Sequence, residues 1–214
     1  MVYRATQQTE ERKARQRQAI LDATRALVGA QGFGPVQVAD VARAAGVAIG
    51  TVYRYFPSKP DLFAEVFAVA AQREVDHVQA AAEGPGTAVE RLAEAVIVFT
   101  RRAARGRRLA YSLIAEPIDP AIEAERLRFR RAYDAVFRRL VAAGIAEGRF
   151  LPQDEAVASA AIVGALAEAL VGPLAPDAIM DAAALDGLVS AMVNFCLRAL
   201  TGRNDPHVER THPL

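Results

Sequence analysis

The chain has 214 residues, of which 52% are hydrophobic and 24% are charged. A chain of this length and composition can bury a substantial core, as one large domain or two small ones, which argues against a disordered protein. The formal net charge is only +1, so overall charge does not by itself indicate a nucleic-acid partner.

Charge is nevertheless distributed unevenly along the chain. Residues 1–60 contain nine lysines and arginines against four acidic residues, a balance of +5, which leaves 17 basic and 21 acidic residues, or −4, for the remainder. A basic segment joined to a mildly acidic body is typical of a protein that meets a polyanion at one end.

The sequence indicates a cytoplasmic protein. The only cysteine, Cys196, cannot form an intramolecular disulfide and fits a reducing compartment. We expect it to be a small buried hydrophobic residue rather than a nucleophile. The N-terminus lacks the apolar core of a secretory signal. The longest apolar stretch, residues 156–171, is shorter than the roughly 20 residues that a membrane-spanning helix needs.

Nearly every segment has the pattern of an α-helix, and the alternation typical of strands is missing. After a polar N-terminal arm, apolar residues along one face predict a first helix that ends at Gly32. Short helices are predicted over residues 37–45 and 48–56, and a longer one from Ser58 to the Gly-Pro-Gly at 84–86. Capping and proline signals then predict helices over residues 87–105, 107–116, 120–146, 154–171 and 176–201.

The predicted fold class is therefore all-α, with about nine helices. We expect an N-terminal three-helix domain over residues 1–57, which carries the basic charge, and a C-terminal helical domain over residues 58–201. The polar, proline-broken tail at residues 202–214 is expected to be disordered.

The segment "VADVARAAGVAIGTVYRYF", residues 38–56, has the pattern of a helix-turn-helix. Two helices that cross through a tight turn need a small residue where they touch, which Ala42 provides. The turn needs a residue that tolerates positive φ, which Gly46 provides. A unit of this kind, at about residues 37–56, exposes its second helix and can present it to the major groove of DNA.

The stretch "GVAIGTVYRYFPSKPDLF", preceded by "AILDATRALVGAQGF", resembles the DNA-binding domain of the TetR (tetracycline-repressor-like) transcriptional regulators over residues 13–67. The rest of the chain resembles the family in size and helical pattern only. The resemblance implies an all-α homodimer that binds double-stranded operator DNA and carries a small-molecule site in its C-terminal domain.

The resemblance also implies which residues meet DNA. Gly50 would allow a close backbone approach, Thr51 would reach a base edge or a phosphate, and Tyr53 and Tyr55 would place their hydroxyls on phosphates. Lys59 would meet a phosphate at the start of the fourth helix. The complete predicted DNA-contacting set is Gln37, Ile49, Gly50, Thr51, Tyr53, Arg54, Tyr55 and Lys59.

The sequence departs from the family pattern at the start of the third helix. The family often has a serine or threonine cap followed by lysine where this chain has Ala48 and Ile49. The change removes a helix cap worth roughly 0.5–2 kcal/mol. It also removes a cationic contact, while Ile49 can contact a thymine methyl group. The operator sequence therefore cannot be inferred from relatives.

Aromatic residues in the helical body that follows the basic segment suggest a site for a largely apolar effector. Taken singly, each is better explained as ordinary helix core, but together they could line a cavity, with Glu116 as a polar anchor. The predicted lining set is Phe67, Phe99, Tyr111, Glu116, Phe129, Tyr133 and Phe137.

The last two predicted helices are expected to form a dimer interface. Residues 156–172 are rich in alanine and glycine with almost no charge, so they need to be covered on all sides, and two such helix pairs can form a four-helix bundle across a two-fold axis. The predicted interface set is Ile162, Leu166, Leu170, Leu185, Leu188, Met192 and Phe195.

Two other classes of function compete with a DNA-binding regulator. An enzyme is disfavoured because the sequence offers no nucleophile–base pair, metal-ligand spacing or phosphate-binding loop, so we expect no catalytic residues, metal or cofactor. A helical module that binds a small molecule or a partner, with a non-functional helix-turn-helix, remains the alternative to a homodimeric repressor that a ligand releases from a palindromic operator.

Overall fold

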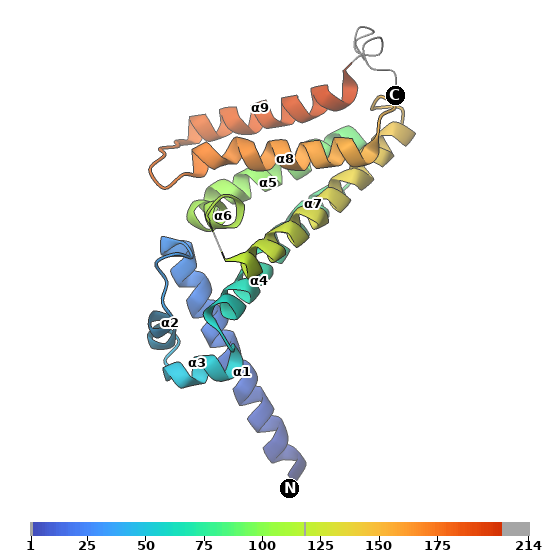
Figure 1. Ribbon diagram of the computed structural model, residues 1–214. Helices are drawn as coiled ribbons and strands as arrows, with labels where there is room; N and C mark the ends of the chain where they lie inside the picture. The colour runs from blue at the N-terminus through green and yellow to red at the C-terminus, as the bar shows by residue number, and fades with distance from the viewer. Residues whose placement is uncertain (1, 118, 203–214) are drawn as a thin grey trace. The chain divides into compact units, whose positions relative to one another are not determined.

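The computed structural model describes residues 2–117 and 119–202, with side chains described from residue 8 onward. Within these ranges the chain forms nine α-helices and no strand (Figure 1), which confirms the predicted fold class. The helices are α1 (Val2–Gln31), α2 (Val38–Ala44), α3 (Ile49–Tyr55), α4 (Lys59–Ala82), α5 (Ala88–Arg105), α6 (Arg107–Ile114), α7 (Pro120–Ala146), α8 (Glu155–Leu174) and α9 (Ala182–Thr201).

Several predicted helix ends are confirmed by their caps. At the start of α4, the Ser58 hydroxyl accepts a hydrogen bond from the Asp61 N–H at 3.2 Å. Before α5, the Thr87 N–H donates to the Glu90 carboxylate at 2.8 Å, completing a capping box. The Thr87 hydroxyl also donates to this carboxylate, at 2.9 Å. The backbone hydrogen bond, and to a lesser degree the side-chain one, lower the pKa of the Glu90 carboxyl.

Three boundaries differ from the prediction. Helix α1 begins at Val2, so the polar arm is itself helical; it is rich in alanine, glutamine, glutamate and arginine, which are good helix formers. Helix α8 continues to Leu174 and includes Pro173 in its last turn. Helix α9 begins at Ala182 rather than near residue 176, because Asp181 caps it by accepting the Ala184 N–H at 2.8 Å. The predicted disordered tail lies outside the described residues, apart from Gly202.

The chain divides into two compact units. The first comprises Met1–Glu74, Ala103–Arg130 and Val171–Ala178, and the second comprises Val75–Arg102, Arg131–Leu170 and the described part of Ile179–Leu214. The domain boundary near residue 57 remains a prediction.

The core of the first unit is a cluster of aliphatic and aromatic side chains from α1 to α4 and α7. The Phe33 ring lies 5.4 Å from the Phe63 ring and 6.2 Å from the Phe67 ring, between centroids. Phe67 in turn lies 6.4 Å from Phe129. These rings are buried, as are Ile20 and the other core aliphatics of α1. The cluster fixes the end of α1 and the turn that follows it against α4.

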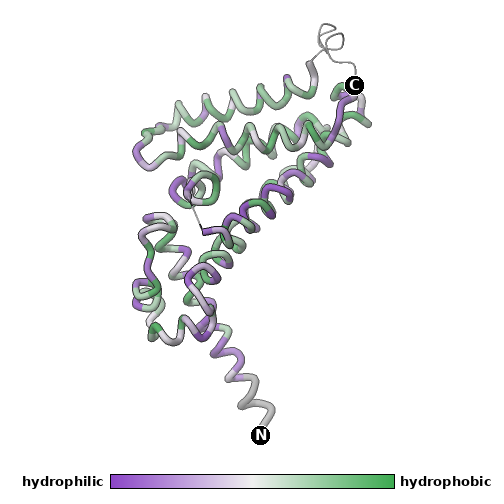
Figure 2. The backbone as a smooth tube through the Cα atoms, viewed as in Figure 1, coloured by the Kyte–Doolittle hydropathy of each residue, from purple (hydrophilic) through white to green (hydrophobic). Residues whose placement is uncertain are grey.

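The second unit is built from parts of α4, α5, α7, α8 and α9. Thr100 of α5 is fully buried and lies 3.5 Å from the Met192 sulfur of α9. Glu147, just after α7, accepts the Ala88 N–H at 2.8 Å and so satisfies a donor at the start of α5. Figure 2 shows α8 and α9 as predominantly hydrophobic along their length.

Candidate nucleic-acid interface

Helices α2 and α3 form the predicted helix-turn-helix. Gly46 has a φ of +66°, a conformation that glycine adopts without strain. The Val47 N–H donates to the Ala42 carbonyl at 3.0 Å and closes the turn. Ala42 and Val41 are buried between the helices, as is Val52 of α3. The small residue and the glycine therefore stand where the crossing and the turn need them.

Helix α3 buries one side and exposes the other. Val52 and Phe56 are buried, so they fix the helix against the core. Ile49 and Tyr53 are each 47% exposed, so two large side chains of this seven-residue helix face outward. Arg54 is exposed and Thr51 is half-buried. The leading edge of α3 is thus available to a partner.

Gly50 has no structural reason to be glycine. Its φ lies outside the left-handed region, and a Cβ built on it would meet no atom within 4 Å. Glycine inside a helix costs about 0.5–1 kcal/mol relative to alanine. Gly50 is exposed, so the space beside its backbone is open to the outside of the chain.

The flanking contacts hold two cations beside aromatic rings. The Arg54 guanidinium lies 5.3 Å from the centre of the Tyr55 ring, and the Lys59 ammonium lies 5.1 Å from that of Phe63. Tyr55 is half-buried, and its hydroxyl donates to the Gln16 side-chain oxygen at 3.2 Å. Lys59 is the first residue of α4 and remains partly exposed. The Arg54 and Lys59 side chains are thus held beside aromatic rings, and their charged groups can still face a phosphate.

The starts of α2 and α3 carry no side-chain cap. Gln37 is exposed and precedes α2 in an extended conformation; its side-chain amide donates to the Pro35 carbonyl at 3.3 Å. Ala48 precedes α3 and offers no acceptor, as the departure from the family pattern predicts. The first N–H groups of both helices therefore have no intrahelical partner.

Two residues that support this surface were not predicted from the sequence. Arg17 of α1 donates to both carboxylate oxygens of Glu65 of α4, and its guanidinium lies 5.1 Å from the centre of the Phe56 ring. Gln16 accepts the Tyr55 hydroxyl. Because these partners lie far apart in the sequence, no local pattern could identify them.

The residues predicted to line a ligand pocket fall in both units. In the first, Phe67 and Phe129 are buried in the aromatic cluster, and the Arg108 guanidinium lies 5.9 Å from the Tyr111 ring centre. In the second, Phe99 and Tyr133 meet edge to face at 5.3 Å, and Phe137 is fully buried.

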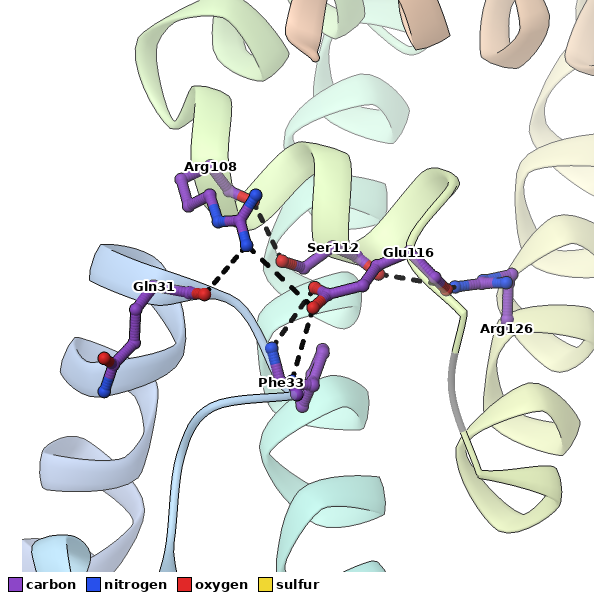
Figure 3. Close-up of polar contacts among 7 residues, drawn as sticks. Gln31, Phe33, Arg108, Ser112, Glu116 and Arg126 are labelled. Carbon is purple, nitrogen blue, oxygen red and sulfur yellow. Dashed lines mark hydrogen bonds and ion pairs between the residues drawn. The ribbon is translucent and has the colours of Figure 1, made fainter. Parts of the chain in front are cut away.

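Glu116, the predicted polar anchor, is nearly buried and fully engaged within the first unit. Its carboxylate accepts the Phe33 N–H at 3.2 Å and the Gly34 N–H at 3.3 Å (Figure 3), and the Arg108 guanidinium lies 4.0 Å away. Residues in this network come from α1, the turn after it, and α6.

The predicted dimer residues divide by exposure. Four of them are buried within the single chain and so present nothing to a second copy: Ile162, Leu166, Leu170 and Met192. Leu185 and Leu188 are half-buried, and Phe195 is 59% exposed. Cys196 is buried as predicted, and burial raises the pKa of its thiol to about 11.

Among the described helices, α8 and α9 are also long and apolar enough to cross a membrane by length and composition alone. Core helices of soluble proteins satisfy the same criterion, so these two helices do not by themselves indicate a membrane protein.

A helix-turn-helix with an exposed second helix, on an all-helical chain, defines a DNA-binding regulator. The family model described as "Bacterial regulatory proteins, tetR family" matches residues 20–66, and that described as "Tetracyclin repressor-like, C-terminal domain" matches residues 85–185. The chain belongs to the TetR family of transcriptional regulators.

Relatives agree with this assignment. The transcriptional repressor KstR of Mycobacterium tuberculosis is 31% identical over 136 residues, 63% of this chain and 62% of that protein. The chain spans 31–62% of the length of the KstR proteins it matches.

Solved structures agree with the fold. The fatty acid degradation regulator FadR of Bacillus halodurans has a TM-score of 0.73 at 25% identity, over 85% of this chain and 94% of that one. FadR of Bacillus subtilis, solved with stearoyl-CoA, has a TM-score of 0.73 at 22% identity, over 86% and 98%. These relatives are regulators of transcription rather than enzymes.

Proposed function

We propose that the protein is a cytoplasmic, homodimeric repressor that reads a palindromic operator with α3 and leaves it when a small ligand binds. The observation that carries the proposal is the exposed edge of α3, where nothing within the chain explains why residue 50 is a glycine. Close approach of DNA would explain it, because the DNA backbone or base edges would occupy the space that a side chain would fill.

We expect contacts of two kinds. Lys59 and Arg54 would meet phosphates, which set affinity and salt dependence. Ile49 and Thr51 are placed at the start of α3, where a recognition helix meets base edges. Tyr53 is exposed and could contact a sugar or a phosphate. The Tyr55 hydroxyl instead donates a hydrogen bond to Gln16 of α1.

A second copy is the best partner for the outer faces of α8 and α9. Val157 and Phe195 are 67% and 59% exposed. Gly164 and Gly187 are exposed and would have no atom within 4 Å of an added Cβ. Small residues allow helices of two copies to approach closely, and a two-fold axis would pair the helices into a bundle.

We propose a long-chain acyl-CoA as the effector. The support is that FadR of Bacillus subtilis was solved with stearoyl-CoA and that the fold matches over most of both chains. Binding would favour an arrangement of the two recognition helices that no longer fits the spacing of the half-sites.

Duplex binding measured across a salt series tests the proposal. The wild-type chain should bind more weakly as salt rises, and Lys59→Ala should bind every duplex more weakly with a salt slope lower by about 1. Stearoyl-CoA should release the duplex, whereas free coenzyme A should not.

If affinity and salt slope are unchanged by Lys59→Ala, the assignment of this edge of α3 to DNA is wrong. A wild-type chain that binds stearoyl-CoA but no duplex would support the alternative of a ligand-binding module with a non-functional helix-turn-helix.

A further inference from the structure

Helix α6 is tied to main-chain atoms of other segments at both ends. At its start, the Arg107 side chain donates to the carbonyl of Leu174 at 3.4 Å and also to the carbonyls of Ala175 and Ala178. These carbonyls belong to the end of α8 and the loop after it, where carbonyls lack intrahelical partners. A single guanidinium therefore anchors the first residue of α6 to the end of α8.

Residues at both ends of α6 also hold the turn between α1 and α2. Near the start of α6, the Arg108 side chain donates to the carbonyl of Gln31, the last residue of α1, at 2.8 Å. Glu116, two residues beyond α6, accepts the N–H groups of Phe33 and Gly34 (Figure 3). We name this set of contacts, from Arg108 and Glu116 to residues 31–34, the Glu116 latch.

Gly32 has the conformation and the size that the latch requires. Its φ is +84°, and an added Cβ would lie 2.6 Å from one Glu116 carboxylate oxygen and 2.8 Å from the other. The turn therefore brings its backbone directly against the carboxylate, so that both following N–H groups point at it.

Arg126 of α7 fixes the backbone of Glu116. Arg126 of α7, whose side chain is only 12% exposed, donates to the Glu116 carbonyl at 2.7 Å and to the Leu113 carbonyl at 3.1 Å. Burial lowers the pKa of the Arg126 guanidinium, while Glu123 and Glu116 act in the opposite direction. The last carbonyls of α6 are thus capped by a cation, and the carboxylate is held on a fixed backbone.

The latch lies at the entry to the helix-turn-helix. Residues 32–37 lead directly from α1 into α2, and α6 is a rigid rod about 12 Å long. A shift of α6 would therefore pull on the turn through the charged carboxylate, since two main-chain donors would lose their acceptor if the turn did not follow.

We propose that Glu116 is a positioning residue for DNA recognition: it fixes the turn after α1 to α6 and so holds α2 and α3 in the orientation that fits an operator. The inference rests on the proposed function, because it assigns Glu116 a role in DNA binding without contact to DNA.

Glu116→Gln tests this role, because the amide keeps the size of the side chain but places a donor where one N–H needs an acceptor. Glu125→Gln is the matched control: it removes the same charge from a carboxylate of α7 that pairs with Arg128 on the surface. Both variants should make the chain less negative, which by charge alone would strengthen DNA binding.

The full chain is measured by amide hydrogen exchange and by duplex affinity across salt. Glu116→Gln should speed exchange at Phe33 and Gly34 by about tenfold or more. It should weaken duplex binding about 3- to 10-fold with an unchanged salt slope, because fewer molecules hold the competent orientation. Glu125→Gln should change neither exchange at these amides nor binding beyond the small charge effect.

Three results would overturn the inference. The first two are unchanged exchange at residues 33–34 and binding by Glu116→Gln as tight as that of the control. The third is a fall in the salt slope, because it would indicate a direct electrostatic effect on DNA. If the wild-type chain retains no duplex at low salt, the proposed function fails and the positioning role fails with it. If it binds and Glu116→Gln binds equally well, only the latch is wrong.

Discussion

At the scale of single residues, some glycines are required by the fold of the chain and others are not. Gly46 needs its positive φ, and Gly32 needs both its φ and its lack of a side chain. Gly50 and Gly29 need neither, because each lies within a helix with open space where a Cβ would be. Gly50 is exposed on α3, whereas Gly29 is half-buried on α1, outside the helix-turn-helix.

Gly50→Ala is predicted to separate stability from DNA binding. Alanine should leave the free energy of unfolding unchanged or raise it by up to about 1 kcal/mol, because the helix gains a better former. Duplex binding should nevertheless weaken by about tenfold or more, since a methyl group would occupy the space of the closest approach. Chemical denaturation and duplex titration measure both.

Gly29→Ala is the matched control and should raise stability with unchanged duplex binding. Equal duplex affinity for Gly50→Ala and the wild type would show that α3 does not approach DNA at this point.

Cys196 is predicted to make stability fall at alkaline pH. Burial raises the pKa of its thiol from 9.0 to about 11. Between these values the unfolded chain releases a proton that the folded chain keeps, so stability is full below pH 9 and falls as pH rises toward 11. The loss attributable to this group is up to about 2–3 kcal/mol.

Urea denaturation of the wild type and of Cys196→Ala from pH 8 to pH 11 measures this loss. The variant keeps every ionisable group except this thiol. The difference between the two profiles of unfolding free energy against pH therefore isolates the contribution of the thiol. Parallel profiles would contradict the assigned burial effect.

At the scale of helices, sequence patterns located elements better than their ends. The helix-turn-helix was predictable because the small residue at 42, the glycine at 46 and the proline at 57 act locally. The start of α9 was not, because Pro176 and Asp177 resemble a helix start, whereas Asp181 provides the cap that the structure uses. The hydrogen bonds of Glu116 were not predictable either, since the two backbone donors lie more than eighty residues away.

The same limit affects α8 and α9, where an apolar pattern does not show which face is covered. Ile162, Leu166 and Met192 turned out to face the interior of the chain. The small residues between them, together with Phe195, form the face that stays exposed. Periodicity predicted two apolar helices correctly but could not assign their faces without the packing of α5 and α7.

Phe195→Glu is predicted to convert a dimer into a monomer. A charge placed on the exposed apolar face would remain unpaired on association, and buried unpaired charges are strongly destabilising. Analytical ultracentrifugation should show a monomer for this variant and a dimer for the wild type. Leu127→Glu, at another exposed apolar residue, on α7, should remain dimeric. A dimeric Phe195→Glu would place the interface elsewhere.

At the scale of the whole molecule, the family and the all-helical fold are established from both sequence and structure. The contacts with DNA, the second copy and the effector are proposals that depend on exposed faces and on relatives. A palindromic site follows only if two copies present their α3 helices about a two-fold axis, with half-site centres about 34–36 Å apart or a multiple of that distance.

The most direct measurement is selection of duplexes from a random pool by the full-length chain, followed by footprinting of the enriched sequences. The account predicts an inverted repeat, with both half-sites protected, centres separated by whole turns of the DNA helix, and the pattern lost with Gly50→Ala. Enrichment of no sequence, or of a single site without symmetry, would contradict the claim that the exposed edge of α3 reads DNA as a symmetric pair.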